Sequence, residues 1–182
     1  MTSVPIRWTI MMFLAGGWAC AVQSGTNVRR DVEEMLRLAG DRTMPSPGEI
    51  LVLRVDTIPV GATRAFLILE SVYRTLGLEL EHVTSSERQL GGTTQRLGPV
   101  EGKSPSAWLD CGQSVNSTSH ADSYDVTLSV ASRVLAIQGF SAVETVLRGK
   151  AQPRDVSGAM ITCTSQGTLE RRIADLVVQR AR

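Results

Sequence analysis

The stretch "YDVTLSVASRVLAIQGFSAVETVLRGKA", residues 124–151, contains two runs in which apolar and polar side chains alternate. The runs, 124–136 and 143–151, flank a segment that contains Gly139. A period of two on both sides of a glycine-bearing turn predicts an antiparallel β-hairpin. One face would carry Tyr124, Val126, Leu128, Val130, Val134 and Ala136, then Val143, Thr145, Leu147 and Ala151. We expect this face to be buried and the opposite face to meet water.

A strand and a helix are predicted upstream of the hairpin. Residues 49–60, "EILVLRVDTIPV", are rich in β-branched side chains and predict a strand that stops at Pro59. Its shared face would carry Leu51, Leu53 and Val55. Residues 61–78 predict the clearest helix, with Gly77 where a left-handed cap belongs. The apolar stripe of this helix consists of Ala62, Ala65, Phe66, Leu69, Val72, Tyr73 and Leu76.

The remaining segments give weaker patterns. Alternating apolar residues predict a strand that begins at Leu78, while "GGTT" (91–94) is interpreted as a turn. The other predicted elements are a helix at 26–40, a short strand at 107–113, a polar loop at 114–123 and a terminal helix at 163–180, capped by Ser165 or Thr168.

This order of elements predicts the fold class and the domain organisation. A strand, a helix, several antiparallel strands and a final helix indicate an α+β fold. We expect a twisted antiparallel sheet with the long helix and the C-terminal helix packed on one face. Residues 49–182 would form this single domain. Residues 22–48 would be an N-terminal tether with a short helix, ending in the loop "DRTMPSPG" (41–48).

Residues 1–21 are typical of a leader for secretion. Arg7 is followed by an apolar or small stretch from Trp8 to Cys20, and polar residues begin at Gln23. This is the order of regions in a secretory signal peptide. Thirteen residues are too few to span a bilayer, which needs about 20. We therefore expect the protein to be exported, to the periplasm or as an outer-membrane lipoprotein.

Cys20 is compatible with two processing routes. Ala19-Cys20-Ala21 fits ordinary cleavage, which would leave a chain that begins at Val22. The position of Cys20 at the end of the apolar run is also the usual placement for lipid attachment, although Trp18 is a poor residue for a lipoprotein signal. The sequence leaves both routes open.

The two remaining cysteines, Cys111 and Cys163, are predicted to form a disulfide. In an exported chain, two cysteines are paired more often than free. The bond would connect the short strand at 107–113 to the beginning of the terminal helix. The alternative is a pair of buried reduced thiols in a cytosolic protein.

Composition excludes several kinds of partner. Nineteen basic and 18 acidic side chains give a formal net charge of +1, without the basic surplus of a nucleic-acid-binding protein. No CxxC pair or histidine cluster suggests a zinc site, so neither a metal nor another cofactor is expected.

Two sets of residues have a functional interpretation and a structural one. Cys111 could be a nucleophile with His120 as its base and Asp122 orienting the imidazole, but no catalytic signature surrounds them, and we expect no enzymatic activity. Trp108 and Tyr124 are candidates to line a ligand groove, and core packing is the alternative.

Three segments carry a resemblance to known proteins. They are "AWLDCGQ" (107–113), "ADSYDVTLSV" (121–130) and "CTSQGTLERRIADLV" (163–177). These segments resemble uncharacterised bacterial envelope proteins over residues 49–181. The order of elements is also similar to that of the helix-grip domains in the NlpB/DapX lipoprotein family, which assists outer-membrane β-barrel assembly. The second resemblance is architectural and transfers no binding or catalytic residue.

These observations predict a non-catalytic envelope protein that binds a protein partner. An alternative is a binder of a small apolar ligand, held between a helix and the concave sheet in a cavity on the order of several hundred Å3. An enzyme that uses Cys111 is the third hypothesis.

Overall fold

An antiparallel sheet of seven strands forms the middle layer of the protein. The computed structural model describes residues 25–41, 53–154 and 158–182. The strands are β1 (Leu53–Ile58), β2 (His82–Thr84), β3 (Gln89–Thr94), β4 (Leu109–Asp110), β5 (Asp125–Ile137), β6 (Phe140–Gln152) and β7 (Ile161–Ser165). They lie in the order β2-β3-β5-β6-β7-β4, and β1 pairs with β6 beside this path.

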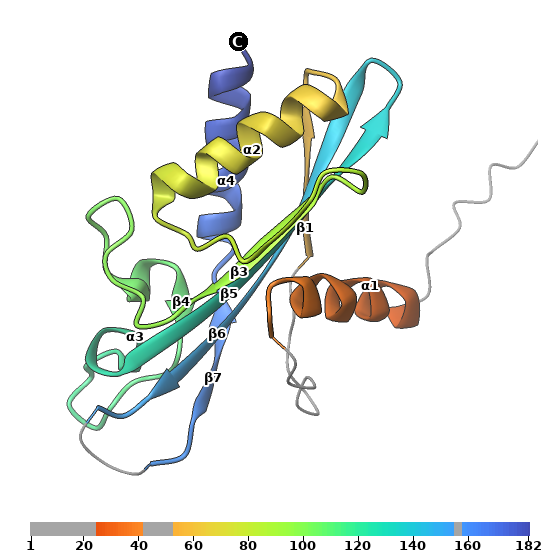
Figure 1. Ribbon diagram of the computed structural model, residues 1–182. Helices are drawn as coiled ribbons and strands as arrows, with labels where there is room; N and C mark the ends of the chain where they lie inside the picture. Colours follow the sequence, from red (N-terminus) through yellow and green to blue (C-terminus); the bar gives the residue numbers. More distant parts are fainter. Residues whose placement is uncertain (1–24, 42–52, 155–157) are drawn as a thin grey trace, which may run out of the picture.

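Helices cover both faces of the sheet (Figure 1). They are α1 (Gly25–Leu38), α2 (Ala62–Leu76), α3 (His120–Ser123) and α4 (Thr168–Ala181), with a 3-10 turn η1 (Pro105–Ala107). Helices α2 and α4 pack on one face, here called the inner face, and α1 packs on the opposite outer face. The predicted α+β class, with a long helix and a C-terminal helix on one face, is confirmed.

The predicted hairpin is the longest pair of strands. The register runs from Asp125 opposite Gln152 to Ile137 opposite Phe140, which leaves two residues for the turn. Gly139 in that turn has φ 75°, a conformation that glycine adopts without steric cost. The expected inner face is buried from Val126 to Val134 and from Val143 to Ala151, although Ala136 near the turn is exposed.

The helix predicted over 61–78 forms as α2 and packs on this inner face. Its buried side chains are Ala65, Phe66, Leu69, Val72, Tyr73 and Leu76. The chain leaves the helix at Gly77, which has φ 68° as expected for a left-handed cap.

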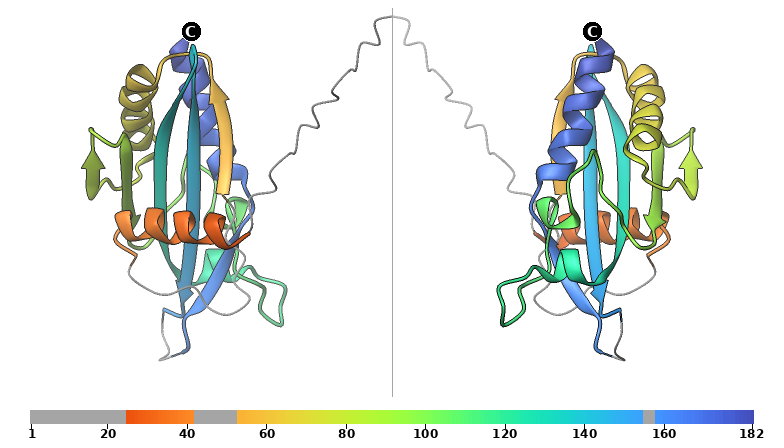
Figure 2. Two further views of the ribbon diagram at one scale, coloured as in Figure 1. Left: turned by 90° about the vertical axis from the view of Figure 1, so that its right-hand side faces the viewer. Right: turned by 90° about the vertical axis from the view of Figure 1, so that its left-hand side faces the viewer.

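The outer face of the hairpin does not meet water where α1 crosses it, and this part of our prediction is wrong. Figure 2 shows α1 lying across the strands. Its buried residues are Val32, Met35, Leu36 and Ala39, which pack against Ala131 of β5 and Val146 of β6. The residues predicted to be a tether thus include a helix whose apolar stripe is buried on the sheet. The leader over 1–21, Cys20 and residues 42–48 of the predicted loop lie outside the described residues.

Strand β1 carries its buried side chain on the face opposite to the one we predicted. Leu53 only partly packs, against the α1 cluster, and Val55 is 54% exposed. Ile58, at the end of the strand, is buried in the inner core instead. The reason is that α4 packs against β1 from the inner face, a contact that periodicity in β1 alone does not reveal.

Residues 91–94 belong to a strand and not to the predicted turn. Gly91 and Gly92 are interior residues of β3 and pair with Ala131 and Val130. A Cβ atom on Gly91 would be 2.9 Å from the carbonyl oxygen of Val130, and one on Gly92 would collide with the backbone of Glu79. These glycines therefore permit a close approach of neighbouring backbone, which is one reason for glycine to occur inside a strand.

The terminal helix begins later than predicted because β7 occupies Ile161–Ser165. The residue before α4 is Gly167, with φ 70°, and no side chain caps the helix there. The Ser165 hydroxyl instead accepts a hydrogen bond from the Gly167 N–H at 3.0 Å and donates one to Glu170 at 2.5 Å. In two other segments, the expected strand at 107–113 is reduced to Leu109–Asp110, and the expected loop at 114–123 contains α3.

Candidate binding groove on the outer face

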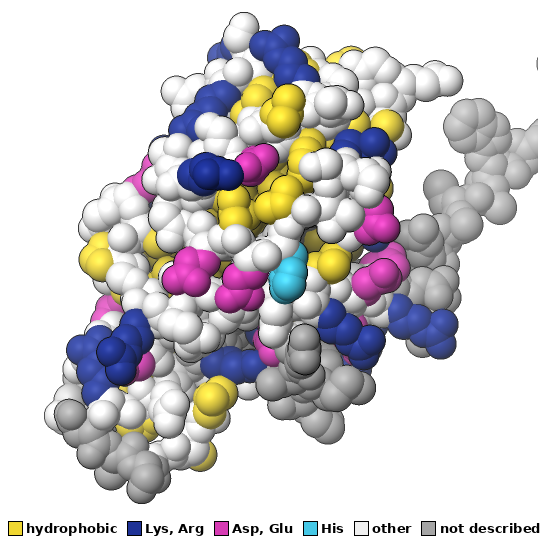
Figure 3. Space-filling model, viewed as in Figure 1, with side chains coloured by type: hydrophobic (Ala, Val, Ile, Leu, Met, Phe, Trp, Pro, Cys, Tyr) yellow, Lys and Arg dark blue, Asp and Glu magenta, His cyan; other side chains and the backbone are white. Residues whose placement is uncertain are grey.

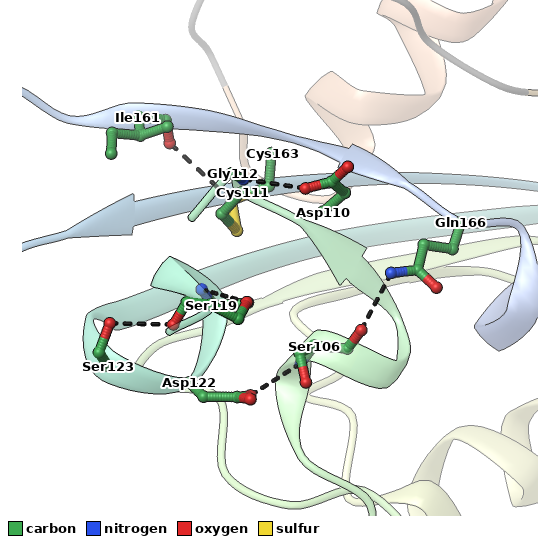
Figure 4. Close-up of a disulfide and its surroundings, with 11 residues drawn as sticks. Ser106, Asp110, Cys111, Gly112, Ser119, Asp122, Ser123, Ile161, Cys163 and Gln166 are labelled. Atoms are coloured by element: carbon green, nitrogen blue, oxygen red, sulfur yellow. Dashed lines mark hydrogen bonds between the residues drawn. A yellow bond between two sulfur atoms is a disulfide. The ribbon is translucent and has the colours of Figure 1, made fainter. Parts of the chain in front are cut away.

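The predicted disulfide is confirmed. The sulfur atoms of Cys111 and Cys163 are 2.00 Å apart, and the bond joins the residue after β4 to the middle of β7 (Figure 4). It connects this end of the sheet to the strand that leads into α4. Because both sulfurs are bonded, Cys111 has no thiol with which to attack a substrate.

His120 and Asp122 have separate surroundings. The His120 ring stacks on Tyr124 with the ring centroids 4.6 Å apart, and its Nδ1 atom has no hydrogen-bond partner within the described part of the chain. Asp122 accepts a hydrogen bond from the Ser106 N–H at 3.0 Å (Figure 4). Burial tends to raise the pKa of Asp122, but its hydrogen bonds from Ser106 and Ser104 outweigh this and lower it. Asp122 therefore positions η1 and does not orient the imidazole.

Trp108 and Tyr124 both contact the inner core. Trp108 is 2% exposed, and the Lys103 ammonium lies 5.3 Å from the centroid of its ring. Tyr124 is partly buried against the same core. Neither residue lines any of the three hollows described below.

The space between α2 and the sheet is filled by the protein itself. The six inner side chains of α2 are at most 5% exposed. One hollow of about 440 Å3 lies on the solvent side of α2, lined by Leu67, Glu70, Ser71, Arg74 and Thr75. Since all of its lining residues come from a single helix, no groups converge on it from different elements.

Two adjoining hollows on the outer face form the candidate site, which we call the outer groove. Their volumes are about 410 Å3 and about 170 Å3. Both are lined by Gln95, Thr127, Lys150, Gln152 and Met160. The larger one is also lined by Gly40, Asp41, Glu81, Thr93 and Ser129, and the smaller one by Arg96 and Asp125.

The floor of the groove is built from outward-facing side chains of β5 and β6. Thr127 lies opposite Lys150, and Asp125 lies opposite Gln152. These pairs lie farther from the hairpin turn than the pair Ala131 and Val146, which α1 covers. The groove therefore begins where the helix stops covering the strands. The alternation of the hairpin sequence placed these residues on one face, but only the position of α1 makes that face a groove.

The end of α1 forms one wall. Gly40, with φ 83°, turns the chain after the helix, and Asp41 then accepts hydrogen bonds from Lys150 at 2.9 Å and from Arg148 at 3.2 Å. Thr93 of β3 donates to the Ala39 carbonyl oxygen at 2.5 Å. Because the side chains of Asp41 and Arg148 are only 4% and 2% exposed, this ion pair is shielded from solvent.

Hydroxyl and amide groups dominate the chemistry of the groove. The Thr127 hydroxyl donates to the Gln95 side-chain oxygen at 2.9 Å, and the Thr93 and Ser129 hydroxyls lie 2.9 Å apart. Lys150 is the one cation common to both hollows, and Met160 supplies their shared apolar side chain. Such a lining can donate and accept hydrogen bonds along an extended polar ligand. Sequence reasoning did not single out any of these residues.

Comparisons with known proteins assign no family. No protein-family model and no curated protein sequence matches the chain. Ara h 8.0201 is similar at 7% identity and a TM-score of 0.40, over 72% of this chain and 97% of that one. A DUF4468 family protein from Bacteroides ovatus ATCC 8483 is similar at 10% identity and a TM-score of 0.38, over 69% and 67%.

A TBP-like protein from Parabacteroides distasonis ATCC 8503 is similar at 9% identity and a TM-score of 0.39, over 75% of this chain and 98% of that one. At TM-scores below 0.5 these similarities carry no functional argument. None of the comparisons supports the resemblance to the NlpB/DapX lipoprotein family.

Proposed function

We propose that the protein is a non-catalytic, exported module of the cell envelope that binds a polar segment of a partner protein in the outer groove. The observation that carries the proposal is the lining of the groove, in which hydroxyl and amide groups from β3, β5 and β6 converge with Lys150. Groups of this kind match the alternating N–H and C=O groups of an extended peptide.

A polar peptide suits this groove better than a small apolar ligand. Sites for small ligands are mostly lined by apolar and aromatic side chains. Met160 is the shared apolar side chain of the outer groove, while the inner residues of α2 already fill the apolar space on the other face. An apolar ligand would therefore have to displace core side chains.

Export is supported by the disulfide and by the leader sequence. Disulfides persist in oxidising compartments such as the periplasm and are rare in the cytosol. No helix among the described residues is long and apolar enough to cross a membrane. The leader over 1–21 offers both processing routes, cleavage before Val22 and acylation of Cys20.

Cell fractionation followed by an intact mass of the mature protein tests the export proposal. A mass that begins at an acylated Cys20, or one that begins at Val22, supports export by the corresponding route. A full-length chain in the cytosolic fraction, with free Cys111 and Cys163, contradicts export.

Site-specific photo-crosslinking tests the binding site. A photoreactive residue in place of Gln152, in the groove, is expected to give one crosslinked partner, whereas the same residue in place of the exposed Gln113 is not. The substitution Gln95→Trp would fill the groove and should abolish the crosslink, while Gln113→Trp is the matched control. Equal crosslinking from both positions, or an unchanged crosslink in Gln95→Trp, contradicts binding in the groove.

A further inference from the structure

The turn end of the β5–β6 hairpin exposes three large apolar side chains on one face. Leu135 is 40% exposed, Ile137 51% and Phe140 49%. Ile137 and Phe140 are directly opposite each other beside the turn, and Leu135 lies two residues before Ile137 on the same face. We call these three residues the tip patch.

The tip patch is exposed because the hairpin extends beyond the helices that cover it. On the outer face, α1 covers Ala131 and Val146, and on the inner face the buried residues end at Val134 and Val143. The pairs closer to the turn project past these contacts, and Figure 2 shows the hairpin end standing clear of α1. Clustered exposed apolar residues of this kind indicate an interaction site more often than single ones do.

Arginines surround the base of the hairpin end. Arg88 donates a hydrogen bond to the Val134 carbonyl oxygen at 3.2 Å, which places it beside β5. Ser141 donates to the Val60 carbonyl oxygen at 2.9 Å, so the first turn of α2, which carries the exposed Arg64, lies at the start of β6.

The C-terminal end of α4 lies at the same end of the molecule and carries the exposed Arg180 and Arg182 (Figure 1). Of the acidic residues there, Glu87 neighbours Arg88, and Asp56 is paired with Arg54 at 2.7 Å. Glu144 and Asp31 are both paired with Arg133. On the face drawn in Figure 3, basic and apolar side chains lie at the top of the molecule, and further basic and acidic side chains lie below them. This end therefore combines an apolar patch with a surplus of positive charge.

We propose that the tip patch inserts into the surface of a bilayer that contains anionic lipids, with the surrounding arginines contacting the lipid phosphates. Half-exposed aliphatic and aromatic side chains beside basic residues are the combination that binds anionic membrane interfaces. A second copy of this chain would not use the arginine surplus, because like charges would face each other across a two-fold axis.

This orientation leaves the outer groove accessible. Thr127 in the groove and Ile137 in the tip patch are ten residues apart along β5, a distance of roughly 33 Å at about 3.3 Å per residue. A protein held on the membrane by its hairpin end would therefore present the groove away from the lipid. The proposal goes beyond partner binding and does not depend on acylation of Cys20.

Flotation with lipid vesicles tests the proposal. Every variant is made in the full chain with Cys20→Ser, so that no acyl chain contributes to binding. Residues 1–24 are therefore the same in all the proteins compared. One set of vesicles contains phosphatidylethanolamine and the anionic lipid phosphatidylglycerol, and the other contains phosphatidylcholine alone. We expect the protein to bind the anionic vesicles and to dissociate as salt is raised.

The double variant Ile137→Asp/Phe140→Asp should lower the partition coefficient by about tenfold or more, since it removes the apolar contact. Val115→Asp is the matched control, because Val115 is 102% exposed and lies in the loop before α3, at the opposite end of the sheet. Arg64→Glu/Arg182→Glu should lower binding to anionic vesicles by about fivefold or more. Phe140→Trp should retain binding and show a blue-shifted fluorescence on addition of vesicles.

Three results would overturn the proposal. The first is a Cys20→Ser parent chain that does not float with anionic vesicles, and the second is equal binding by the Ile137→Asp/Phe140→Asp variant and the control. The third is a dimer of the Cys20→Ser parent chain in solution that this double variant separates while vesicle binding stays unchanged, which would assign the patch to a second copy. Loss of vesicle binding in the Gln95→Trp variant is not expected, so failure here and failure of the groove are separable.

Discussion

The phenolic oxygen of Tyr73 lies 2.7 Å from the hydroxyl oxygen of Ser132, inside the layer between α2 and the sheet. The Ser132 hydroxyl is in turn 2.8 Å from that of Thr145 on β6. All three residues are at most 2% exposed. Burial raises the pKa of Tyr73 well above its ordinary value of 10. The phenol therefore stays protonated and connects α2 to both strands of the hairpin.

Replacing Tyr73 by phenylalanine should lower the free energy of unfolding by about 1–2 kcal/mol, because it leaves the buried Ser132 hydroxyl with Thr145 as its remaining side-chain partner. Urea denaturation measures this change. Tyr124→Phe, at a half-buried position outside this chain of hydroxyls, should change stability by less than about 0.5 kcal/mol. Equal losses in the two variants would contradict the role of the buried chain.

Asp41 should be needed to hold the end of α1 on the sheet. The change Asp41→Ala removes a carboxylate that both Lys150 and the buried Arg148 contact, so we expect a loss on the order of 3 kcal/mol. Hydrogen exchange should rise over residues 25–41. The exposed Arg29–Glu33 pair provides the control, since Arg29→Ala should cost no more than about 0.5 kcal/mol. Unchanged exchange in α1 after Asp41→Ala would be the contrary result.

The disulfide should contribute a large share of the stability. Cys111 and Cys163 are separated by 52 positions, and a loop of that length corresponds to about 4 kcal/mol in the chain-entropy model. The double variant Cys111→Ser/Cys163→Ser should lose about this amount in denaturation experiments. Cys20→Ser should leave the unfolding transition of the domain unchanged, and an equal loss in that variant would argue against this assignment.

Glu170 should make stability depend on pH. Its side chain is fully buried, and this desolvation raises the pKa of Glu170 above its ordinary value of 4.5, although the Ser165 hydrogen bond lowers it in part. Folding thus favours the protonated form. The stability that this protonation contributes is fully present below about pH 4.5, and it is lost as the pH rises through the raised pKa of Glu170.

We expect the wild-type chain to lose stability relative to Glu170→Gln as the pH is raised from about 4 to about 7, because only the wild type must bury a charge. Urea denaturation at several pH values measures the difference. A difference that stays constant across this range would show that Glu170 does not titrate with folding.

Gly92 should tolerate no side chain. Gly92 lies in β3, beside β5, and Gly92→Ala would place a methyl group against the Glu79 carbonyl. We expect the free energy of unfolding to fall by about 2 kcal/mol or more, because backbone atoms cannot move aside easily. Gly98→Ala is the control, since a Cβ atom there meets nothing within 4 Å. Thermal unfolding compares the two, and similar melting temperatures would refute the close packing.

Local pattern was sufficient to predict the elements whose apolar side chains repeat along one face. The alternation over 124–151 predicts the β5–β6 hairpin, and the three- and four-residue spacing over 61–78 predicts α2, because one face of each is apolar and must find a core. The even number of cysteines after the leader predicted the Cys111–Cys163 bond.

Patterns failed where a residue's partner comes from a distant segment. The glycines at 91–92 suggest a turn, but their reason is the close approach of backbone from residues 39, 79 and 130. Likewise, the alternation in β1 does not reveal that α4 would bury Ile58 and leave Val55 exposed.

The amino-acid sequence by itself determined the α+β class, the hairpin, α2 and the disulfide, because these follow from periodicity and pairing within the chain. Only the tertiary structure decided what the outer face of the sheet does. Helix α1 covers the middle of that face and leaves the polar groove around Lys150 on one side and the apolar tip patch around Phe140 on the other. Both surfaces depend on where a helix stops, and that position is set by packing between segments distant in sequence.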